Sequence, residues 1–260
     1  MSEGAGPSAC TSLLPAGYLF SQHSLNTFVR CPRRFLLKYV DRQPWPMPEE
    51  EDPQEYLEHL ARGRIFHQWL ARLHLDLAVE PIASASEDPQ LRAWWAAAQQ
   101  FDRDELPSWL REAELPVVIP LGDYRLYARY DLVALDPGGE AVVVDWKTLA
   151  ALPSERTLRS RMQTRVYLYT LVAAGHILSE GIPVNPANAR MVYWFANYPD
   201  AATSIRYSAQ AFREDGQYLM QLAEQIARQP REAFARTDDL RQCAHCAYRS
   251  LCQRDEQQER

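Results

Sequence analysis

The segment YARYDLVALDPGGEAVVVDWKTL, residues 127–149, holds two strand-like runs on either side of a glycine-rich turn, and it constrains the fold more than any other stretch. Both runs are rich in β-branched and aromatic residues, and the tight turn between them favours an antiparallel hairpin. With a Pro-Gly-Gly loop that puts Asp136 opposite Glu140, counting outward along the two strands places Asp131 opposite Asp145. The hairpin therefore predicts two acids that face each other on one sheet.

Facing carboxylates need a compensating partner, because like charges directly opposite each other cost a few tenths to about 1 kcal/mol. Mg²⁺ is such a partner, since it takes oxygen ligands and often uses one or two carboxylates with water and phosphate. Strand alternation also places Lys147 on the face of Asp145 and turns Trp146 to the other face. Two acids and a lysine around one spot suit metal-dependent hydrolysis of a phosphodiester.

The simpler alternative is that Asp145 and Lys147 form a surface strand pair, as most isolated Asp-x-Lys sequences do. The apolar run AVVV before Asp145 argues against this alternative, because it is typical of a buried strand. A carboxylate on a buried strand requires a partner.

Two helical stretches carry residues that fit the same chemistry. In RGRIFHQWL, Gly63 lies one turn before His67 and clears space over the imidazole. In RMQTRVYLY, Gln163 and Tyr167 are four residues apart and share a helix face. Alone, a helical histidine or a Gln-Tyr pair is more often structural, so these residues gain meaning only beside the acids and the lysine.

Helical periodicity comes first along the chain, gives way to strand-like patterns, and returns later. This order predicts an α/β (α+β) fold with a mixed central sheet flanked by helices. We expect helices at 24–40 (N-cap Ser24, divided by Pro32), 55–78 (core stripe Phe66, Leu70, Leu73, Leu77) and 89–111, strands at 114–121, 124–135 and 140–148, a long helix at 155–178, strands at 189–197 and 203–209, and a helix at 209–229.

The length of 260 residues, 47% of them hydrophobic, predicts a single elaborated domain. We expect a loose N-terminus over residues 1–20, an acidic proline-rich loop at 44–53 and a catalytic core at 113–200. No apolar run approaches the roughly 20 residues that a membrane span requires, and the N-terminus lacks the pattern of a signal peptide. We therefore expect a cytoplasmic protein without a membrane partner.

The formal net charge of −6 does not favour a polyanion, so any contact with nucleic acid must use local basic patches. Each patch, taken alone, is more often an ordinary solvated helix face. The candidates for DNA binding are Arg30, Arg33, Arg34 and Lys38, followed by Arg42, and then Arg156, Arg159, Arg161 and Arg165.

The order of RGRIFH, YARYD, VVVDWKT and QTRVY resembles the RecB-like branch of the PD-(D/E)XK nuclease superfamily, over about residues 24–254. The resemblance implies a divalent cation, Mg²⁺ or Mn²⁺, and a catalytic lysine, Lys147. Ala128 stands where the family usually has glycine, which leaves every proposed ligand in place. The resemblance assigns metal binding to His67, Asp131, Asp145, the Trp146 carbonyl and, as an extra acid, Glu114, and support of the lysine or the DNA to Gln163 and Tyr167.

Three of the five cysteines form a C-x2-C-x5-C array of Cys243, Cys246 and Cys252, and Cys31 lies far upstream. This arrangement resembles the iron-sulfur subgroup, which includes CRISPR-associated RecB-like nucleases and the nuclease domain of AddB. The resemblance implies a 4Fe-4S cluster that joins Cys31 to residues 240–254 and packs the N-terminal helical region against the tail. Zinc remains an alternative, held by the four cysteines or by three with His245. Cys10 is left over.

The combined features predict a Mg²⁺- or Mn²⁺-dependent deoxyribonuclease that acts on single-stranded DNA or DNA ends, as an exonuclease rather than an endonuclease. We expect a role in repair, recombination or CRISPR adaptation. The chain has no G-x-x-x-x-G-K-[ST] loop, so any unwinding needs a helicase partner. The alternative is a non-catalytic module that binds DNA or a partner protein on a nuclease fold.

Overall fold

The chain divides into two compact units. A computed structural model describes residues 12–44, 53–75, 77–244 and 246–252. The terminal unit comprises Met1–Glu50, Pro120–Arg125 and Tyr218–Arg260, and the sheet unit comprises Glu51–Ile119 and Leu126–Gln217. Whereas the chain length predicts one elaborated domain, the predicted catalytic core and the predicted cysteine region thus belong largely to different units.

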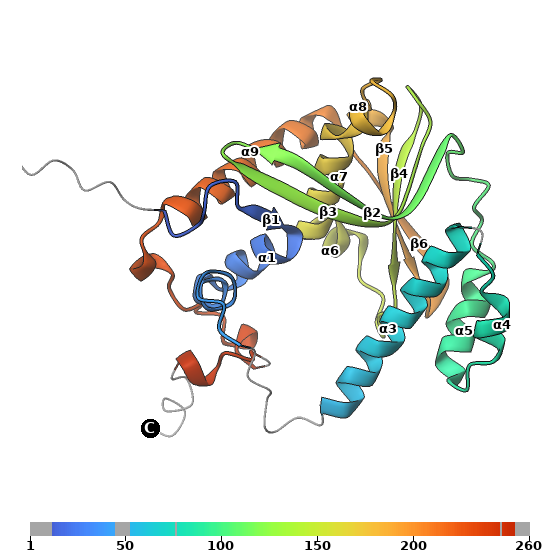
Figure 1. The fold of residues 1–260 in the computed structure, drawn as a ribbon, viewed down its shortest axis with the longest axis horizontal. Helices are drawn as coiled ribbons and strands as arrows, with labels where there is room; N and C mark the ends of the chain where they lie inside the picture. Colours follow the sequence, from blue (N-terminus) through green and yellow to red (C-terminus); the bar gives the residue numbers. More distant parts are fainter. Residues whose placement is uncertain (1–11, 45–52, 76, 245, 253–260) are drawn as a thin grey trace, which may run out of the picture. The chain divides into compact units, whose positions relative to one another are not determined.

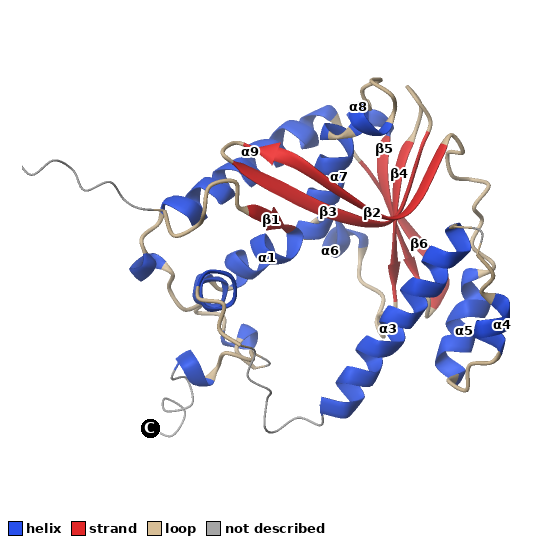
Figure 2. Cartoon of the chain, in the orientation of Figure 1, coloured by secondary structure: helices blue, strands red, loops and turns tan. Residues whose placement is uncertain are grey.

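The sheet unit is built on a mixed β-sheet, as predicted (Figures 1 and 2). β3 runs antiparallel to β4, β4 runs parallel to β5, and β5 runs antiparallel to β6. β2 pairs with β3. The strands are β2 (Leu110–Leu121), β3 (Tyr124–Leu135), β4 (Ala141–Lys147), β5 (Ala189–Phe195) and β6 (Tyr198–Arg206). The adjoining ends of β2 and β3, within Pro120–Arg125, belong to the terminal unit.

The turn between β3 and β4 has the predicted register. Asp136 donates its backbone N–H to the carbonyl of Glu140 at 3.0 Å, and Leu135 lies opposite Ala141. Gly138 adopts a φ of +70°, a conformation that glycine reaches without strain. The turn therefore fixes which residues of the two strands face each other.

Helices cover both faces of this sheet. The apolar residues of α3, α4 and α5 pack on one face, where Trp146 and Trp194 lie edge to face with ring centroids 5.6 Å apart. Trp146 thus points away from the face of Asp145, as strand alternation predicts. The helices of the sheet unit are α3 (Pro53–His74), α4 (Glu80–Ser84), α5 (Pro89–Ala98), α6 (Glu155–Arg159), α7 (Met162–Ala173) and α8 (Gly175–Leu178), with a 3-10 turn at Pro186–Asn188.

The helix predicted at 89–111 is too long, because α5 ends at Ala98 and β2 already begins at Leu110. Between α5 and β2, carboxylate side chains accept hydrogen bonds from backbone N–H groups. Asp102 accepts from the Asp104 N–H, and Asp136 accepts from the Trp109 N–H at 2.9 Å. Such side-chain bonds compete with the bonds of a helix.

Three other helix boundaries differ from the prediction. The cap of the first helix is Ser21, and Ser24 instead completes a capping box with it. The long helix expected at 155–178 is broken into α6, α7 and α8, since Arg161 takes an extended conformation between α6 and α7. α3 ends at His74, so Leu77 lies beyond it and is 47% exposed.

The terminal unit packs the N-terminal helical region against the C-terminal tail, as predicted. The ring centroids of Phe28 and Phe234 lie 5.9 Å apart, and Arg33 donates its backbone N–H to the carbonyl of Ala235 at 3.0 Å. Pro32 divides the helical region as expected. The elements are β1 (Leu19–Ser21), α1 (Gln22–Arg30), α2 (Pro32–Phe35), a π-helical turn (Leu36–Val40) and 3-10 turns at Arg231–Ala233, Leu240–Gln242 and Ser250–Cys252; α9 (Ala209–Arg228) has residues in both units.

Part of the segment expected to be loose is packed. Ser12 donates its hydroxyl to the carbonyl of Ala227 at 3.0 Å, and Leu14 and Phe20 are buried. Residues 1–11, with Cys10, lie outside the described residues, as do residues 45–52 of the acidic loop and His245. Among the described helices, none has the length and apolar character of a membrane span.

Gly175 and Gly63 differ in the space that their surroundings leave for a side chain. A Cβ at Gly175 would lie 2.6 Å from Cγ2 of Val184, whereas a Cβ at Gly63 would lie 3.6 Å from Oγ1 of Thr148. We expect Gly175→Ala to lower the free energy of unfolding by about 1–3 kcal/mol through overpacking. The matched variant Gly63→Ala should not lower it, because alanine favours a helix interior by about 0.5–1 kcal/mol. Urea denaturation checks both, and equal stability of the two variants would contradict the packing at Gly175.

Candidate functional site

The hydrogen-bond ladder between β3 and β4 stops next to the predicted acids. Paired residues run from Leu135 opposite Ala141 to Leu132 opposite Val144. In a continued ladder the Trp146 N–H would reach a backbone carbonyl of β3, because hydrogen-bonded pairs alternate. Instead it donates to Oδ2 of Asp131 at 2.9 Å. The predicted opposition of Asp131 and Asp145 is thus replaced by a side-chain bond at the end of the ladder.

This bond also fixes the direction of the Trp146 carbonyl. The N–H and C=O of one strand residue point to the same edge of the strand. Because the Trp146 N–H reaches Asp131, the carbonyl of Trp146 points to the same side of β4. This is the orientation required of the predicted backbone ligand.

His67, Glu114 and Asp131 come from three separate elements and converge here. Their ligand atoms all lie within 4.8 Å of one another. Nδ1 of His67, on α3, lies 3.4 Å from Oδ1 of Asp131. Glu114, on β2, has a φ of +56°, a strained conformation for a residue with a Cβ. The Glu114 carboxylate thus meets the other two side chains at a residue with strained backbone.

The pKa values of Glu114 and His67 are both raised in this cluster. Burial raises the pKa of Glu114, and the charge of Asp131 adds to the rise, while Arg129 opposes it from 2.7 Å. For His67, burial favours the neutral ring, but the hydrogen bond and charge of Asp131 outweigh it and raise the pKa overall. The cluster thus favours bound protons, or another cation, between its side chains.

Asp145 lies in a second group with Lys147 and Gln163. Nζ of Lys147 lies 2.6 Å from Oδ2 of Asp145 and donates to Oε1 of Gln163 at 3.1 Å. Gln163 in turn donates through Nε2 to Oδ1 of Asp145 at 2.6 Å. The glutamine on α7 therefore bridges the acid and the amine that β4 presents on one face.

Burial of Asp145 is nearly complete, at 2% exposure, and it raises the pKa from 3.8 to about 6. Lys147 opposes this rise, and the charge of Asp131 adds to it. The two acid-bearing groups are therefore electrostatically coupled.

Tyrosines form the back of the site. Tyr167 is buried one helical turn from Gln163, so it supports the glutamine from inside rather than from a surface. The pKa of Tyr167 is raised by burial and by the charges of Asp145 and Asp131. Tyr193, which the sequence interpretation missed, lies opposite Asp145 on β5, and its ring is 5.8 Å from Nζ of Lys147. Strand alternation on the predicted strand 189–197 is the signal that could have found it.

The donor set fits a divalent cation. It combines an imidazole, three carboxylates and a backbone carbonyl, and oxygen donors of this kind suit Mg²⁺ or Mn²⁺. Oδ2 of Asp145 is buried and accepts no hydrogen bond of good geometry, despite the nearby amine of Lys147. Asp145 itself lies outside the three-residue cluster of closest ligand atoms. A cation between Asp131 and Asp145 would offset the charge of Asp131 that raises the pKa of Asp145.

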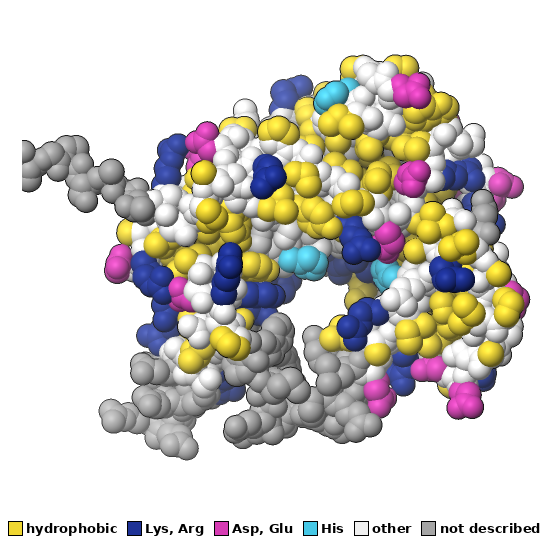
Figure 3. All heavy atoms as spheres, in the orientation of Figure 1, with side chains coloured by type: hydrophobic (Ala, Val, Ile, Leu, Met, Phe, Trp, Pro, Cys, Tyr) yellow, Lys and Arg dark blue, Asp and Glu magenta, His cyan; other side chains and the backbone are white. Residues whose placement is uncertain are grey.

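The predicted basic residues of the sheet unit have different surroundings. Arg165 pairs with Asp215 through Nε at 3.2 Å, so it serves packing of α9 on α7 within this unit. Arg159 pairs with Glu155, and Arg161 lies 6.0 Å from the ring of Tyr193 beside Lys147. Arg156 is exposed. Figure 3 shows Lys or Arg and Asp or Glu side chains interspersed over α3, α4 and α5.

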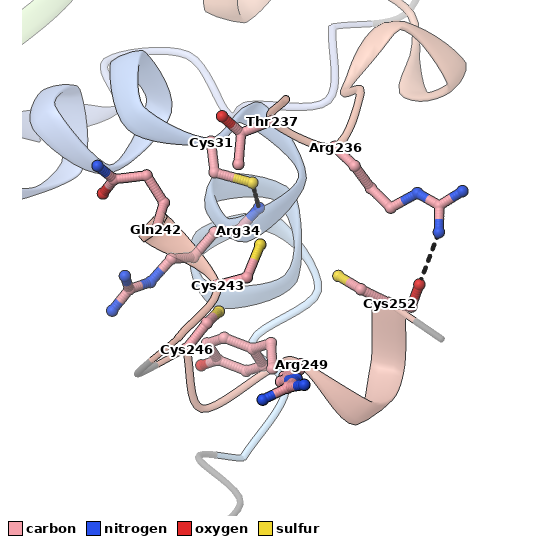
Figure 4. A pocket seen from close by; sticks show the side chains of 10 residues that line it. Cys31, Arg34, Arg236, Thr237, Gln242, Cys243, Cys246, Arg249 and Cys252 are labelled. Atoms are coloured by element: carbon pink, nitrogen blue, oxygen red, sulfur yellow. Dashed lines mark hydrogen bonds between the residues drawn. The ribbon is translucent and has the colours of Figure 1, made fainter. Parts of the chain in front are cut away.

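The cysteines of the terminal unit line one pocket. Cys31, Cys243, Cys246 and Cys252 all contribute to its wall, and Figure 4 shows their sulfur atoms around a common space. Cys31 caps α2, and its Sγ accepts from the Arg34 N–H at 3.4 Å. The fold thus brings Cys31 next to the three cysteines that lie more than 200 residues later in the sequence.

Positive charge surrounds these thiols. Burial raises the pKa of the Cys252 thiol, Cys246 and Cys31 add to the rise, and Arg33 opposes it. Arg34 also lines the pocket, and its buried Nε has no hydrogen-bond partner among the described residues. Of the other predicted DNA-binding residues, Arg30 is exposed and Lys38 lies 5.3 Å from the ring of Tyr39.

The chain was compared with known proteins and with solved structures. The chain is similar to the solved structure of SSO0001, at 17% identity over 92% of this chain and 87% of that chain, with a TM-score of 0.45. It is also similar to an inferred exonuclease from Eubacterium rectale, at 10% identity over 82% of this chain and 80% of that chain, with a TM-score of 0.46. No curated protein matches the sequence.

The family match covers most of the chain. Residues 19–253 of the 260 match the PD-(D/E)XK nuclease superfamily, and this range contains both the acid-lysine site and the pocket lined by cysteines. The chain therefore belongs to the PD-(D/E)XK nuclease superfamily.

Proposed function

We propose that this protein is a metal-dependent deoxyribonuclease of the RecB-like, iron-sulfur subgroup. The observation that carries the proposal is the convergence of His67, Glu114 and Asp131 beside the linked Asp145 and Lys147. Clustered carboxylates can bind a divalent cation, and a nearby amine can stabilise charge on the phosphate, so the two together suit phosphodiester hydrolysis.

Each group has a role in this proposal. His67, Glu114, Asp131, Asp145 and the Trp146 carbonyl would hold Mg²⁺ or Mn²⁺, which when bound polarises the phosphate and acidifies a water molecule. Lys147 neutralises charge that develops on the phosphate or orients the attacking water. Gln163 fixes the position of the amine, and Tyr167 supports Gln163.

For the cysteine pocket we propose a 4Fe-4S cluster rather than zinc. Cys31, Cys243, Cys246 and Cys252 line one pocket, and four thiolates complete the ligand set of such a cluster. Arg33 lies near the Cys252 thiol and Arg34 lines the pocket, so both would offset the negative charge of a cluster. Zinc held by the same four thiolates is the alternative.

The substrate that we propose is single-stranded DNA or a DNA end, cleaved as by an exonuclease. Of the predicted DNA-binding residues of the sheet unit, Arg156 and Arg161 are the best placed to contact a phosphate backbone, because Arg165 is engaged by Asp215 and Arg159 by Glu155. We propose that Arg159 contacts the DNA beside them. We propose a role in repair, recombination or CRISPR adaptation, with a helicase as partner, in the cytoplasm, where reducing conditions preserve thiolate ligands.

Cleavage of labelled single-stranded DNA with Mn²⁺ tests the proposed activity. We expect Lys147→Ala and Asp131→Asn to lower kcat/KM at least about a hundredfold, because each removes a group that acts on the phosphate or holds the cation. Asp200→Asn, at an exposed acid on β6, is the matched control and should retain wild-type activity. Equal cleavage by the wild type and Lys147→Ala would remove the catalytic assignment. Binding without cleavage by any of them would favour a non-catalytic module.

The raised pKa of Asp145 predicts a pH-dependent stability of the metal-free protein. Because the fold binds this proton more tightly than the unfolded chain, the stabilisation is complete below pH 3.8 and is lost as the pH rises through about 6. In EDTA, the free energy of unfolding of the wild type minus that of Asp145→Asn should therefore increase between about pH 8 and about pH 5. Urea denaturation measures both. A difference that stays constant with pH would show that Asp145 titrates normally.

The cysteine pocket predicts a brown protein with visible absorption and bound iron. We expect Cys31→Ser to lose this absorption and to lower the melting temperature, since the pocket links α2 to the C-terminal tail. Cys10→Ser is the matched control and should keep both. Colourless wild-type protein with stoichiometric zinc, prepared without oxygen, would contradict the cluster.

A further inference from the structure

The sheet unit has a pocket that begins next to β4. Its volume is about 440 Å³. α3, the start of α5, the residues after β4 and the turn between β5 and β6 all contribute to its wall. The side chains that matter to the argument are His59, Arg62, Asp88, Gln90, Thr148 and Asn197.

This pocket lies beside the active site along α3. His59, Gly63 and His67 are spaced four residues apart on that helix, so they share one face, and His59 to His67 spans about 12 Å. Gly63 faces Thr148, which directly follows Lys147, and a Cβ at Gly63 would lie 3.6 Å from Oγ1 of Thr148. A DNA strand cleaved beside His67 would therefore pass close to the pocket.

The charges of the pocket balance one another. Arg62 pairs with Asp88 at 2.6 Å and lies 3.5 Å from Glu58. Asp88 is also engaged as the cap of α5, where its carboxylate accepts from the Gln90 N–H. A pocket whose arginine is already neutralised fits an uncharged heterocycle better than a phosphate.

The wall of the pocket is firmly held. Asn197 accepts from Nε1 of Trp94 at 2.8 Å and donates to the carbonyl of Leu149 at 2.9 Å. Gln90 donates to the same asparagine oxygen at 3.2 Å. His59 is exposed and stands edge to face against the buried Trp94, with ring centroids 6.4 Å apart. The pocket thus offers one imidazole face and amide groups that are already oriented.

We infer that this pocket binds a nucleobase of the substrate strand, stacked on His59 and in hydrogen-bond reach of the Gln90 amide. Imidazole and amide groups are the side chains that stack on bases and bond their edges. The inference rests on the proposed nuclease function and adds a substrate feature to it. A base in this pocket is unpaired, so the pocket selects single strands at the site of cleavage.

An abasic-site scan tests the inference. Single-stranded oligonucleotides carry one abasic site, moved by one nucleotide at a time, and the rate of each cleavage is measured with Mn²⁺. For the wild type, we expect an abasic site at one fixed distance from the cut to lower kcat/KM between about fivefold and a hundredfold, as loss of one stacked base does. For His59→Ala, kcat/KM with intact DNA should fall by a similar factor, and the dependence on abasic position should disappear.

His176→Ala, at an exposed histidine of α8 outside the pocket, is the matched control and should retain the wild-type scan. Equal melting temperatures of the two variants exclude a folding defect. A wild-type scan without a sensitive position, or a sensitive position that persists in His59→Ala, would overturn the inference while the nuclease proposal stands. Absence of cleavage of every oligonucleotide by the wild type would overturn both.

Discussion

The hydrogen bond from the Trp146 backbone to Asp131 is the contact on which the candidate active site depends. The pairing of β3 with β4 ends at this bond. The Trp146 N–H is accepted by the carboxylate of Asp131 instead of by a backbone carbonyl of β3. The strand edge beyond it becomes open to the side chains of other elements. His67 from α3 and Glu114 from β2 lie close to Asp131 here. Asp145 on β4 contacts Lys147 instead.

The acids of the candidate site repel one another, and a bound cation would relieve this repulsion. Burial and neighbouring acids raise the proton affinity of Glu114 and Asp145, and the positive φ of Glu114 adds backbone strain. Arg129 pairs with Glu114, and Lys147 and the amide of Gln163 contact Asp145. Strain and like charge of this kind are typical of functional sites, where fold stability is given up for binding.

Local sequence rules predicted much of this arrangement. The glycine turn gave the register of β3 and β4, alternation gave the opposite directions of Trp146 and Lys147, and helical spacing placed Gln163 with Tyr167. Other features depend on contacts between distant segments, which a pattern does not contain. The positive φ of Glu114, the place of Tyr193 beside Lys147 and the capture of the Trp109 N–H by Asp136 are of this kind. The division into two units also follows from contacts between the two ends of the chain.

The proposed metal site requires that separate elements deliver their donors to one shared cation. Anomalous X-ray scattering from crystals grown with Mn²⁺ tests it most directly, because it locates manganese without reference to activity. We predict a peak between Asp131 and Asp145, within bonding distance of both carboxylates and of His67. Manganese bound elsewhere, or no peak at a saturating Mn²⁺ concentration, would contradict the account.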